Sequence, residues 1–301
     1  MEGRGNNANE APHPHQVPTS DASRCAGAAR TPRAAPARIR QADVDWIAAR
    51  LGPRDWDVVE TINVVRVASG QQLERVCFAA ASAGRSRTVV RSRVLARLVQ
   101  WRVLAPVGRR VGGRAKGSTV QVYALDSAGQ RLLTERQLAV GDRVRVRRPG
   151  APGIYSLRHL LAVSELYATL VERARASGLA LDTFRAEPGA HWPDGRGGVL
   201  KPDAYAVLAR PGARDHWWIE VDLATESLPT VKAKLVAYLE FRRRGETGPD
   251  ELTPYVLVAA STERRRDAIA GVVRRLPEAK DFVRVVHLPE AATFMFEVLR
   301  E

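Results

Sequence analysis

Cysteine is scarce in this sequence, which has Cys25 and Cys77 and no others among its 301 residues. One lies in an expected tail and the other in an expected helix, so a zinc cluster or a disulfide framework is excluded. Long apolar runs are also missing, since none approaches the roughly 18 residues that a membrane-spanning helix needs. No apolar stretch follows the basic residues near the N-terminus, so we expect no signal peptide. These absences predict a protein of the reducing cytoplasm without a membrane partner.

Negative charge is in deficit as well. The sequence has 47 Lys and Arg residues against 33 Asp and Glu residues, which gives a formal charge of +14 and a pI near 10.7. This balance favours a polyanionic partner, and nucleic acid is the first candidate. A GC-rich genome is the alternative explanation for the many arginines, because Ala and Val are abundant too.

Residues 1–40 are rich in Ala, Pro, Arg, Gly and Asn and have few large apolar side chains. Such a segment cannot bury enough surface to offset the entropy of ordering, so we expect a disordered basic tail. Its arginines could contact phosphates loosely, but a solvated tail is the preferred interpretation.

Residues 41–135 show the pattern of a winged helix-turn-helix domain. Three segments have apolar residues at helical spacing, with Pro53 suited to a first helical turn and Ser69 to an N-cap. A further helix is predicted in the arginine-rich stretch from residue 84, where Val90, Val94 and Leu98 share one face. Residues 109–133 then predict a hairpin with a glycine-rich, basic tip.

The arginine-rich helix and the hairpin tip together predict a DNA-binding surface. A helix that presents arginines and small polar residues can enter a major groove, while a basic wing contacts phosphates. Winged helices also serve as protein-interaction modules and are often dimeric, so a protein partner and a homodimer remain open alternatives. The candidate DNA-binding residues are Arg85, Arg87, Ser92, Arg93, Arg97, Arg110, Arg114 and Lys116.

Residues 136–153 are charged and contain Pro and Gly, as is typical of a linker between domains. Residues 154–301 then alternate helix and strand in the predicted order α-β-β-β-α-β-α-β. This order indicates a mixed sheet flanked by helices. The sequence therefore predicts a two-domain chain of the α+β and α/β classes, with a winged helix-turn-helix followed by the mixed sheet.

Acidic residues gather at the ends of two predicted strands in the second domain. Glu220 and Asp222 are two positions apart and so share one face of a strand. At roughly 4 Å and an effective dielectric near 20, two such charges repel by about 4 kcal/mol, so a cation, a base or a shared proton should offset them. A short Pro-Gly connection predicts an antiparallel hairpin that brings Asp203 to the same end. Lys234 on the next helix is expected to reach back over the strands, whereas Lys232 points to solvent.

This set of side chains suits a magnesium ion, which prefers oxygen ligands and keeps several waters. Bound to a phosphodiester, such a cation polarises the phosphoryl oxygen, and a lysine stabilises the developing charge. The alternative is structural, because acids at strand ends often cap the following helix or pair with arginine. Tyr238 lies on the apolar face of the same helix as Lys234, so we assign it to the core.

Several short motifs give the chain a family resemblance. The strings "LKPD", "IEVD" and "TE", followed by a helix with "KLVAY", resemble the PD-(D/E)xK nuclease core. Over roughly residues 50–260, with "GPRDWDVVETI", "SGQQLERVCF", "RHLLAVSELYATL", "KPDAYAVL" and "WWIEVDLATES", the chain resembles the replication-relaxation proteins of actinobacterial plasmids and integrative elements. That family joins an N-terminal winged helix to a nuclease-like domain.

The resemblance implies roles for individual residues. Asp203 matches the nuclease aspartate and Glu220 the first acid of the motif, while Asp222 occupies the position expected to hold lysine. Either Lys234 supplies the positive charge from a migrated position, or the site is not a competent nuclease. The implied metal ligands are Asp203, Glu220 and Asp222, with Lys234 completing the catalytic set.

Three further residues complete the candidate site. Glu165 and Glu187 are candidate additional ligands. His159 is a candidate phosphate contact, although a packed or capping histidine is the preferred interpretation. The implied function is double-stranded DNA binding in plasmid or mobile-element replication and relaxation, with magnesium-dependent nicking or cleavage. The alternative is a non-catalytic replication initiator or transcriptional regulator with a degenerate nuclease-like domain.

Overall fold

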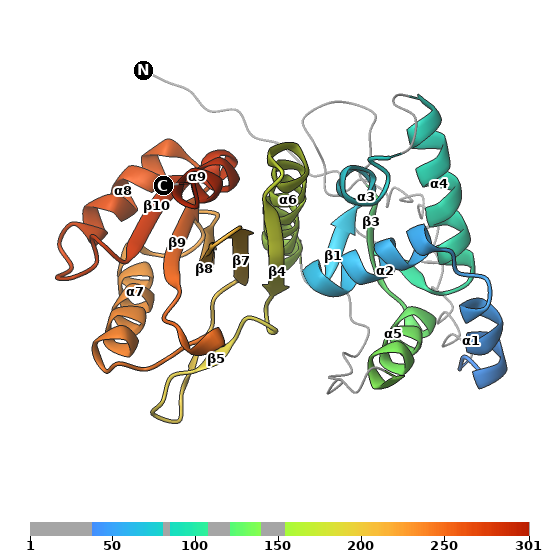
Figure 1. Cartoon of the computed structure of the whole chain (residues 1–301), viewed down its shortest axis with the longest axis horizontal. Helices are drawn as coiled ribbons and strands as arrows, with labels where there is room; N and C mark the ends of the chain where they lie inside the picture. The colour runs from blue at the N-terminus through green and yellow to red at the C-terminus, as the bar shows by residue number, and fades with distance from the viewer. Residues whose placement is uncertain (1–37, 81–84, 108–120, 140–153, 301) are drawn as a thin grey trace, which may run out of the picture. The chain divides into compact units, whose positions relative to one another are not determined.

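A computed structural model describes residues 38–80, 85–107, 121–139 and 154–300 (Figure 1). The expected tail up to residue 37, the hairpin tip with Arg110, Arg114 and Lys116, and residues 140–153 of the expected linker lie outside these ranges. From Ile39 onward the described residues belong to one compact unit. Among them, no helix combines the length and the apolar character that crossing a membrane requires.

The first helices begin where the sequence offers capping groups. Pro53 occupies the first turn of α2, and the Asp55 carboxylate accepts a hydrogen bond of 2.9 Å from the Gly52 N–H. Ser69 caps α3, as predicted, because its Oγ accepts from the Gln72 N–H at 3.2 Å while the Gln72 side chain accepts from the Ser69 N–H. The helices of this region are α1 (Gln41–Ala48), α2 (Pro53–Val65), α3 (Gly70–Cys77) and α4 (Arg85–Gln100).

A small antiparallel sheet has one strand between α2 and α3 and two strands after α4. Its strands are β1 (Val67–Ser69), β2 (Leu104–Pro106) and β3 (Val122–Leu125), in the order β1-β3-β2. Strand β3 lies in the predicted return strand, but its partner β2 precedes the predicted hairpin of residues 109–133, and β1 was not anticipated. Three residues between two helices are too short a segment to show a strand periodicity.

Helix α5 (Ser127–Ala139) corrects two expectations from the sequence. Residues 127–133 of this helix were assigned to the hairpin, and its last four residues were assigned to the linker. In the structure, Leu132 and Leu133 are buried, and this burial favours the helix. Gly129 lies so close to strand β2 that an added Cβ would clash with the Val103 carbonyl oxygen, so this glycine permits close packing and does not mark a turn.

Residues 154–300 form a mixed sheet covered by helices on both faces, as predicted. The strands lie in the order β10-β9-β8-β7-β4, antiparallel among β4, β7 and β8 and parallel among β8, β9 and β10. The expected loop around residue 195 carries a small hairpin of β5 and β6, and α9 after the last strand was not anticipated. The elements are α6 (Ile154–Ser177), β4 (Ala180–Ala186), β5 (Trp192–Pro193), β6 (Val199–Leu200), β7 (Ala204–Arg210), β8 (Ala213–Asp222), α7 (Leu228–Arg243), η1 (Pro249–Glu251), β9 (Tyr255–Ala260), α8 (Glu263–Val273), β10 (Val283–His287), η2 (Leu288–Glu290) and α9 (Ala291–Val298).

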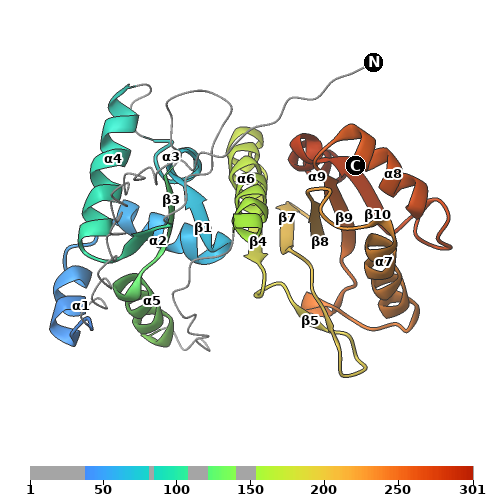
Figure 2. The ribbon, with the colours of Figure 1, turned by 180° about the vertical axis from the view of Figure 1, so that it is seen from behind.

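The two faces of this sheet have separate cores, which the alternation of β8 makes clear. Trp217, Ile219 and Val221 pack in the core that α6 and α9 cover, while Trp218 packs in the core under α7 and α8 (Figure 2). Glu220 and Asp222 follow Trp218 at alternate positions, so they face α7 and α8. The sheet therefore directs both acids toward the helix that carries Lys234.

Candidate functional site

A pocket of about 590 Å³ lies where β7 begins and β8 ends. Asp203 comes directly before Ala204, which pairs with Ile219, and Glu220 comes directly after Ile219. This register sets the two carboxylates opposite each other across the hairpin. The charged and titratable side chains that line the pocket are His159, Glu187, Asp203, Glu220, Asp222, Glu226 and Lys234.

Asp203 is held by groups from two elements. Its Oδ2 accepts a hydrogen bond of 2.7 Å from the backbone N–H of Val221, and its Oδ1 lies 3.0 Å from Nε2 of His159 on α6. The hydrogen bond to Asp203 raises the pKa of His159, although burial opposes the rise. His159 therefore lies in the pocket, with its ring held against the carboxylate of Asp203.

Glu220 is buried, and each of its two carboxylate oxygens accepts a hydrogen bond. Its Oε1 accepts a hydrogen bond of 2.6 Å from the Tyr238 hydroxyl, and its Oε2 lies 3.4 Å from Lys234 Nζ. Burial raises the pKa of Glu220 to about 7, and the charge of Asp203 adds to the rise, while Lys234 and Tyr238 oppose it. The pocket thus favours the protonated form of this carboxyl more than water does.

Asp222 is neutralised by an arginine from α8. Nε and Nη2 of Arg265 lie 2.8 and 2.9 Å from its two oxygens, in the bidentate arrangement that arginine and carboxylate favour. The backbone N–H of Ala224 donates to the same carboxylate at 2.8 Å. Asp222 thus lines the same pocket as Asp203 and Glu220, but its charge is balanced by Arg265.

Lys234 and Lys232 differ as the helical spacing suggested. Lys234 Nζ lies between two acids, 3.4 Å from Glu220 Oε2 and 2.9 Å from Glu226 Oε2, while Lys232 is exposed. Glu226 belongs to the segment between β8 and α7. Lys234 therefore connects this segment to Glu220 in β8. A lysine at this place can offer positive charge to a phosphate in the pocket.

The two additional candidate ligands, Glu187 and Glu165, lie in different places in the structure. Glu187 lines the pocket and accepts a hydrogen bond of 2.9 Å from Arg66, and its backbone N–H donates to the Asp203 carbonyl. Glu165 is outside the pocket lining, because its carboxylate pairs with Arg75 and accepts from the Gln72 amide at 3.0 Å. Glu165 therefore joins α6 to α3, a structural contact that its position on a helix did not reveal.

Helix α4 places its predicted DNA-binding residues in different surroundings. Ser92 and Arg93 are exposed together with Ala96 and Gln100. By contrast, Nη2 of Arg97 lies 2.5 Å from the buried Asp55, and Arg87 donates to the Ala79 carbonyl at 3.2 Å. The Arg85 side chain lies outside the described part of the chain. Within the described part of the chain, Arg93 is thus the arginine of this set that is exposed and makes no hydrogen bond or ion pair.

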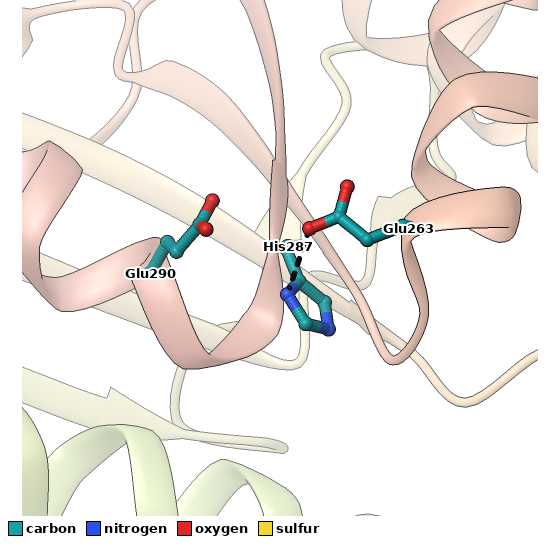
Figure 3. Close-up of side chains that lie close together, drawn as sticks. All are labelled: Glu263, His287 and Glu290. Atoms are coloured by element: carbon teal, nitrogen blue, oxygen red, sulfur yellow. Dashed lines mark ion pairs between the residues drawn. The ribbon is translucent and has the colours of Figure 1, made fainter.

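A second cluster of metal-binding residue types lies where strands β9 and β10 end (Figure 3). Glu263, His287 and Glu290 each offer a ligand atom, and these atoms lie within 4.8 Å of one another. Nδ1 of His287 is 3.1 Å from Glu263 Oε1, and Arg266 lies 2.5 Å from the other oxygen of Glu263. Glu263 thus takes part in a surface ion-pair network with Arg266 and His287, and Arg266 pairs with Asp267 as well.

Three groups of the site escaped the sequence analysis. Tyr238 was assigned to the core, and although its ring is buried there, its hydroxyl reaches Glu220. Its spacing of one turn from Lys234 was the available signal, because residues four apart on a helix face the same way. Arg265 gave no such signal, since only the fold brings it beside Asp222. Glu226 belongs to the "TE" string noted in the sequence, but its ion pair with Lys234 was not anticipated.

Comparison with protein-family models finds a match to the family described as Replication-relaxation, over residues 59–256. Comparison with curated proteins and comparison with solved structures find no match. The matched segment begins in α2 and ends in β9, so it contains Asp203, Glu220 and Lys234.

Proposed function

The chain belongs to the replication-relaxation family, and from this premise we propose that it binds double-stranded DNA of a plasmid or other mobile element in the cytoplasm. In this proposal α4 and the following hairpin hold the DNA, and the pocket at Asp203 and Glu220 binds Mg²⁺ and nicks or cleaves it. The observation that carries the catalytic half is the convergence of Asp203, Glu220 and Lys234 in one pocket.

The order of elements supports the DNA-binding half. Helices α2, α3 and α4, with β1 between the first two and the β2–β3 hairpin after the last, follow the winged helix order. The exposed side of α4 combines Arg93 and Gln100 with the small residues Ser92 and Ala96, which allow close approach to base edges. The formal charge of +14 on the whole chain favours contacts with DNA phosphates.

The donor set of the pocket fits a hard cation with two acids from the chain. Asp203 and Glu220 offer oxygen atoms opposite each other, whereas Asp222 is committed to Arg265. When bound, Mg²⁺ supplies Lewis-acid polarisation of a phosphodiester. The residues of the chain orient the two carboxylates, and Lys234 places its ammonium group where negative charge develops on the phosphate.

The second candidate function is a non-catalytic replication initiator or regulator. The residue at position 222 favours it, because the nuclease motif expects a lysine there and this chain has an aspartate that pairs with Arg265. In that case the pocket serves binding or assembly, and DNA binding through α4 is unaffected by the loss of the acids.

Incubation of supercoiled plasmid with the protein and Mg²⁺ separates the two candidates. We expect nicked or linear product from the wild type and none from Asp203→Ala or Glu220→Ala, with the loss of all product when the metal is chelated. Glu240→Ala is the matched control, because this glutamate is exposed on α7 away from the pocket lining. DNA binding without any metal-dependent product from the wild type would select the non-catalytic function.

A further inference from the structure

Tyr238 is a buried tyrosine whose hydroxyl points at the acidic site. Its side chain is 2% exposed, and its ring packs on Trp218 with the ring centroids 5.5 Å apart. The hydroxyl donates to Glu220 Oε1 at 2.6 Å, a short distance that is typical of a charge-assisted hydrogen bond. The packed ring therefore fixes the place of a strong donor at one oxygen of the acid.

Tyr238 cannot act on a substrate directly. It is not among the residues that line the pocket, and burial raises the pKa of its hydroxyl well above the ordinary value. A phenol that is buried, protonated and hydrogen-bonded is a poor nucleophile for DNA strand transfer. Whatever Tyr238 contributes to the site must pass through Glu220.

Two side chains of α7 hold Glu220, one at each carboxylate oxygen. Lys234 lies one helical turn before Tyr238 on α7 and approaches the other oxygen of Glu220, at 3.4 Å. A donor at each oxygen limits rotation of the carboxylate, and each oxygen retains a lone pair for a cation. Ligands oriented in this way by neighbouring hydrogen bonds bind metal ions more tightly.

We propose that Tyr238 is a positioning residue that holds the Glu220 carboxylate in the orientation in which it binds a divalent cation together with Asp203. This inference rests on the proposed function, since it requires that the pocket binds Mg²⁺. It adds a residue outside the pocket to the determinants of metal affinity, and it assigns the buried hydroxyl a role beyond packing.

The test measures the affinity of the full chain for Mg²⁺ by titration calorimetry, and for Mn²⁺ by electron paramagnetic resonance. Tyr238→Phe removes one oxygen and keeps the ring on Trp218, so we expect a folded variant with metal binding weakened by about 10- to 100-fold. Nicking should recover at higher metal concentration, because the lost interaction affects metal binding and not the chemical step. Tyr205→Phe is the matched control, since its buried hydroxyl binds His216 at 2.7 Å outside the pocket lining.

A double-mutant cycle keeps the test valid if removal of the hydroxyl alone destabilises the fold. Glu220→Gln combined with Tyr238→Phe leaves no buried charge without its donor, and it should bind metal as Glu220→Gln does alone. A further loss in the double variant, or wild-type affinity in Tyr238→Phe, would overturn the positioning role while Glu220-dependent binding still stood. Absence of any Glu220-dependent metal binding in the wild type would overturn both this inference and the catalytic proposal.

Discussion

The acids at the end of β8 have separate partners, and these partners explain how two carboxylates share one face. Asp222 is paired with Arg265, whereas Glu220 is held by Tyr238 and Lys234 and is buried enough to hold a proton near neutral pH. The repulsion that the sequence implied is therefore offset without a metal at Asp222, and the remaining acidic pair is Glu220 with Asp203. The ion pair of Asp222 with Arg265 is the main feature that the structure adds to the expected site.

Glu220 should make stability depend on pH. Burial raises its pKa from the ordinary 4.5 to about 7, so the folded protein binds more protons than the unfolded chain between these values. The resulting stabilisation is full below pH 4.5 and is lost as pH rises to about 7, by up to about 3 kcal/mol. Urea unfolding at pH 5, 6, 7 and 8 measures it, and Glu220→Gln should flatten the part of the slope below pH 7. His159, whose pKa is also raised, gives a similar trend above pH 6.5 that this variant should keep.

Glycines at two helices test the account of how elements pack. Gly129→Ala should lower the free energy of unfolding by about 1–3 kcal/mol, because its Cβ would meet the Val103 carbonyl at β2. Gly271→Ala, inside α8 where a Cβ meets nothing nearer than 3.6 Å, should instead stabilise by about 0.5–1 kcal/mol. Thermal or urea unfolding distinguishes the two, and a stable Gly129→Ala would show that α5 does not pack on β2 as described.

The same elements show what the sequence could predict. Strongly periodic segments such as α2 and α6, caps such as Ser69, and the β7–β8 hairpin followed from local pattern. Helix α5 was missed because Gly129 serves a contact between distant segments, and no local rule identifies such a contact. Asp203, Glu220 and Lys234 were found because strand alternation and helical spacing limit where side chains point, whereas Arg265 needed the tertiary fold.

At the scale of the whole molecule, α6 links the two regions that the sequence predicted. Ser164 Oγ donates to the Val67 carbonyl of β1 at 2.6 Å, and Arg75 of α3 pairs with Glu165 and Glu172. Arg66, which follows α2, also binds Glu187 at the edge of the acidic pocket. The helices expected to hold DNA and the pocket expected to act on it therefore belong to one continuous set of contacts.

DNA affinity should fall steeply with salt if the positive charge of the chain meets phosphates. With about six to ten phosphate contacts, the loss of DNA affinity between 50 and 200 mM salt is about 10³- to 10⁵-fold.

Arg93→Ala should weaken DNA binding by about 1–3 kcal/mol, as expected for an exposed arginine of α4 that meets a base edge. Arg97→Ala should mainly lower stability, because it leaves the buried Asp55 without its partner. Fluorescence anisotropy with labelled duplex DNA measures the affinity of the wild type and of both variants at each salt concentration. An affinity that salt leaves unchanged would favour a protein partner.

The claim on which the catalytic account depends is that Asp203 and Glu220 hold a divalent cation between them. Anomalous diffraction from a crystal soaked in Mn²⁺ tests it most directly. The account predicts a peak bound by oxygens of Asp203 and Glu220, with Asp222 still paired to Arg265. A pocket without a peak at saturating Mn²⁺, or a peak confined to Glu263, His287 and Glu290, would contradict it.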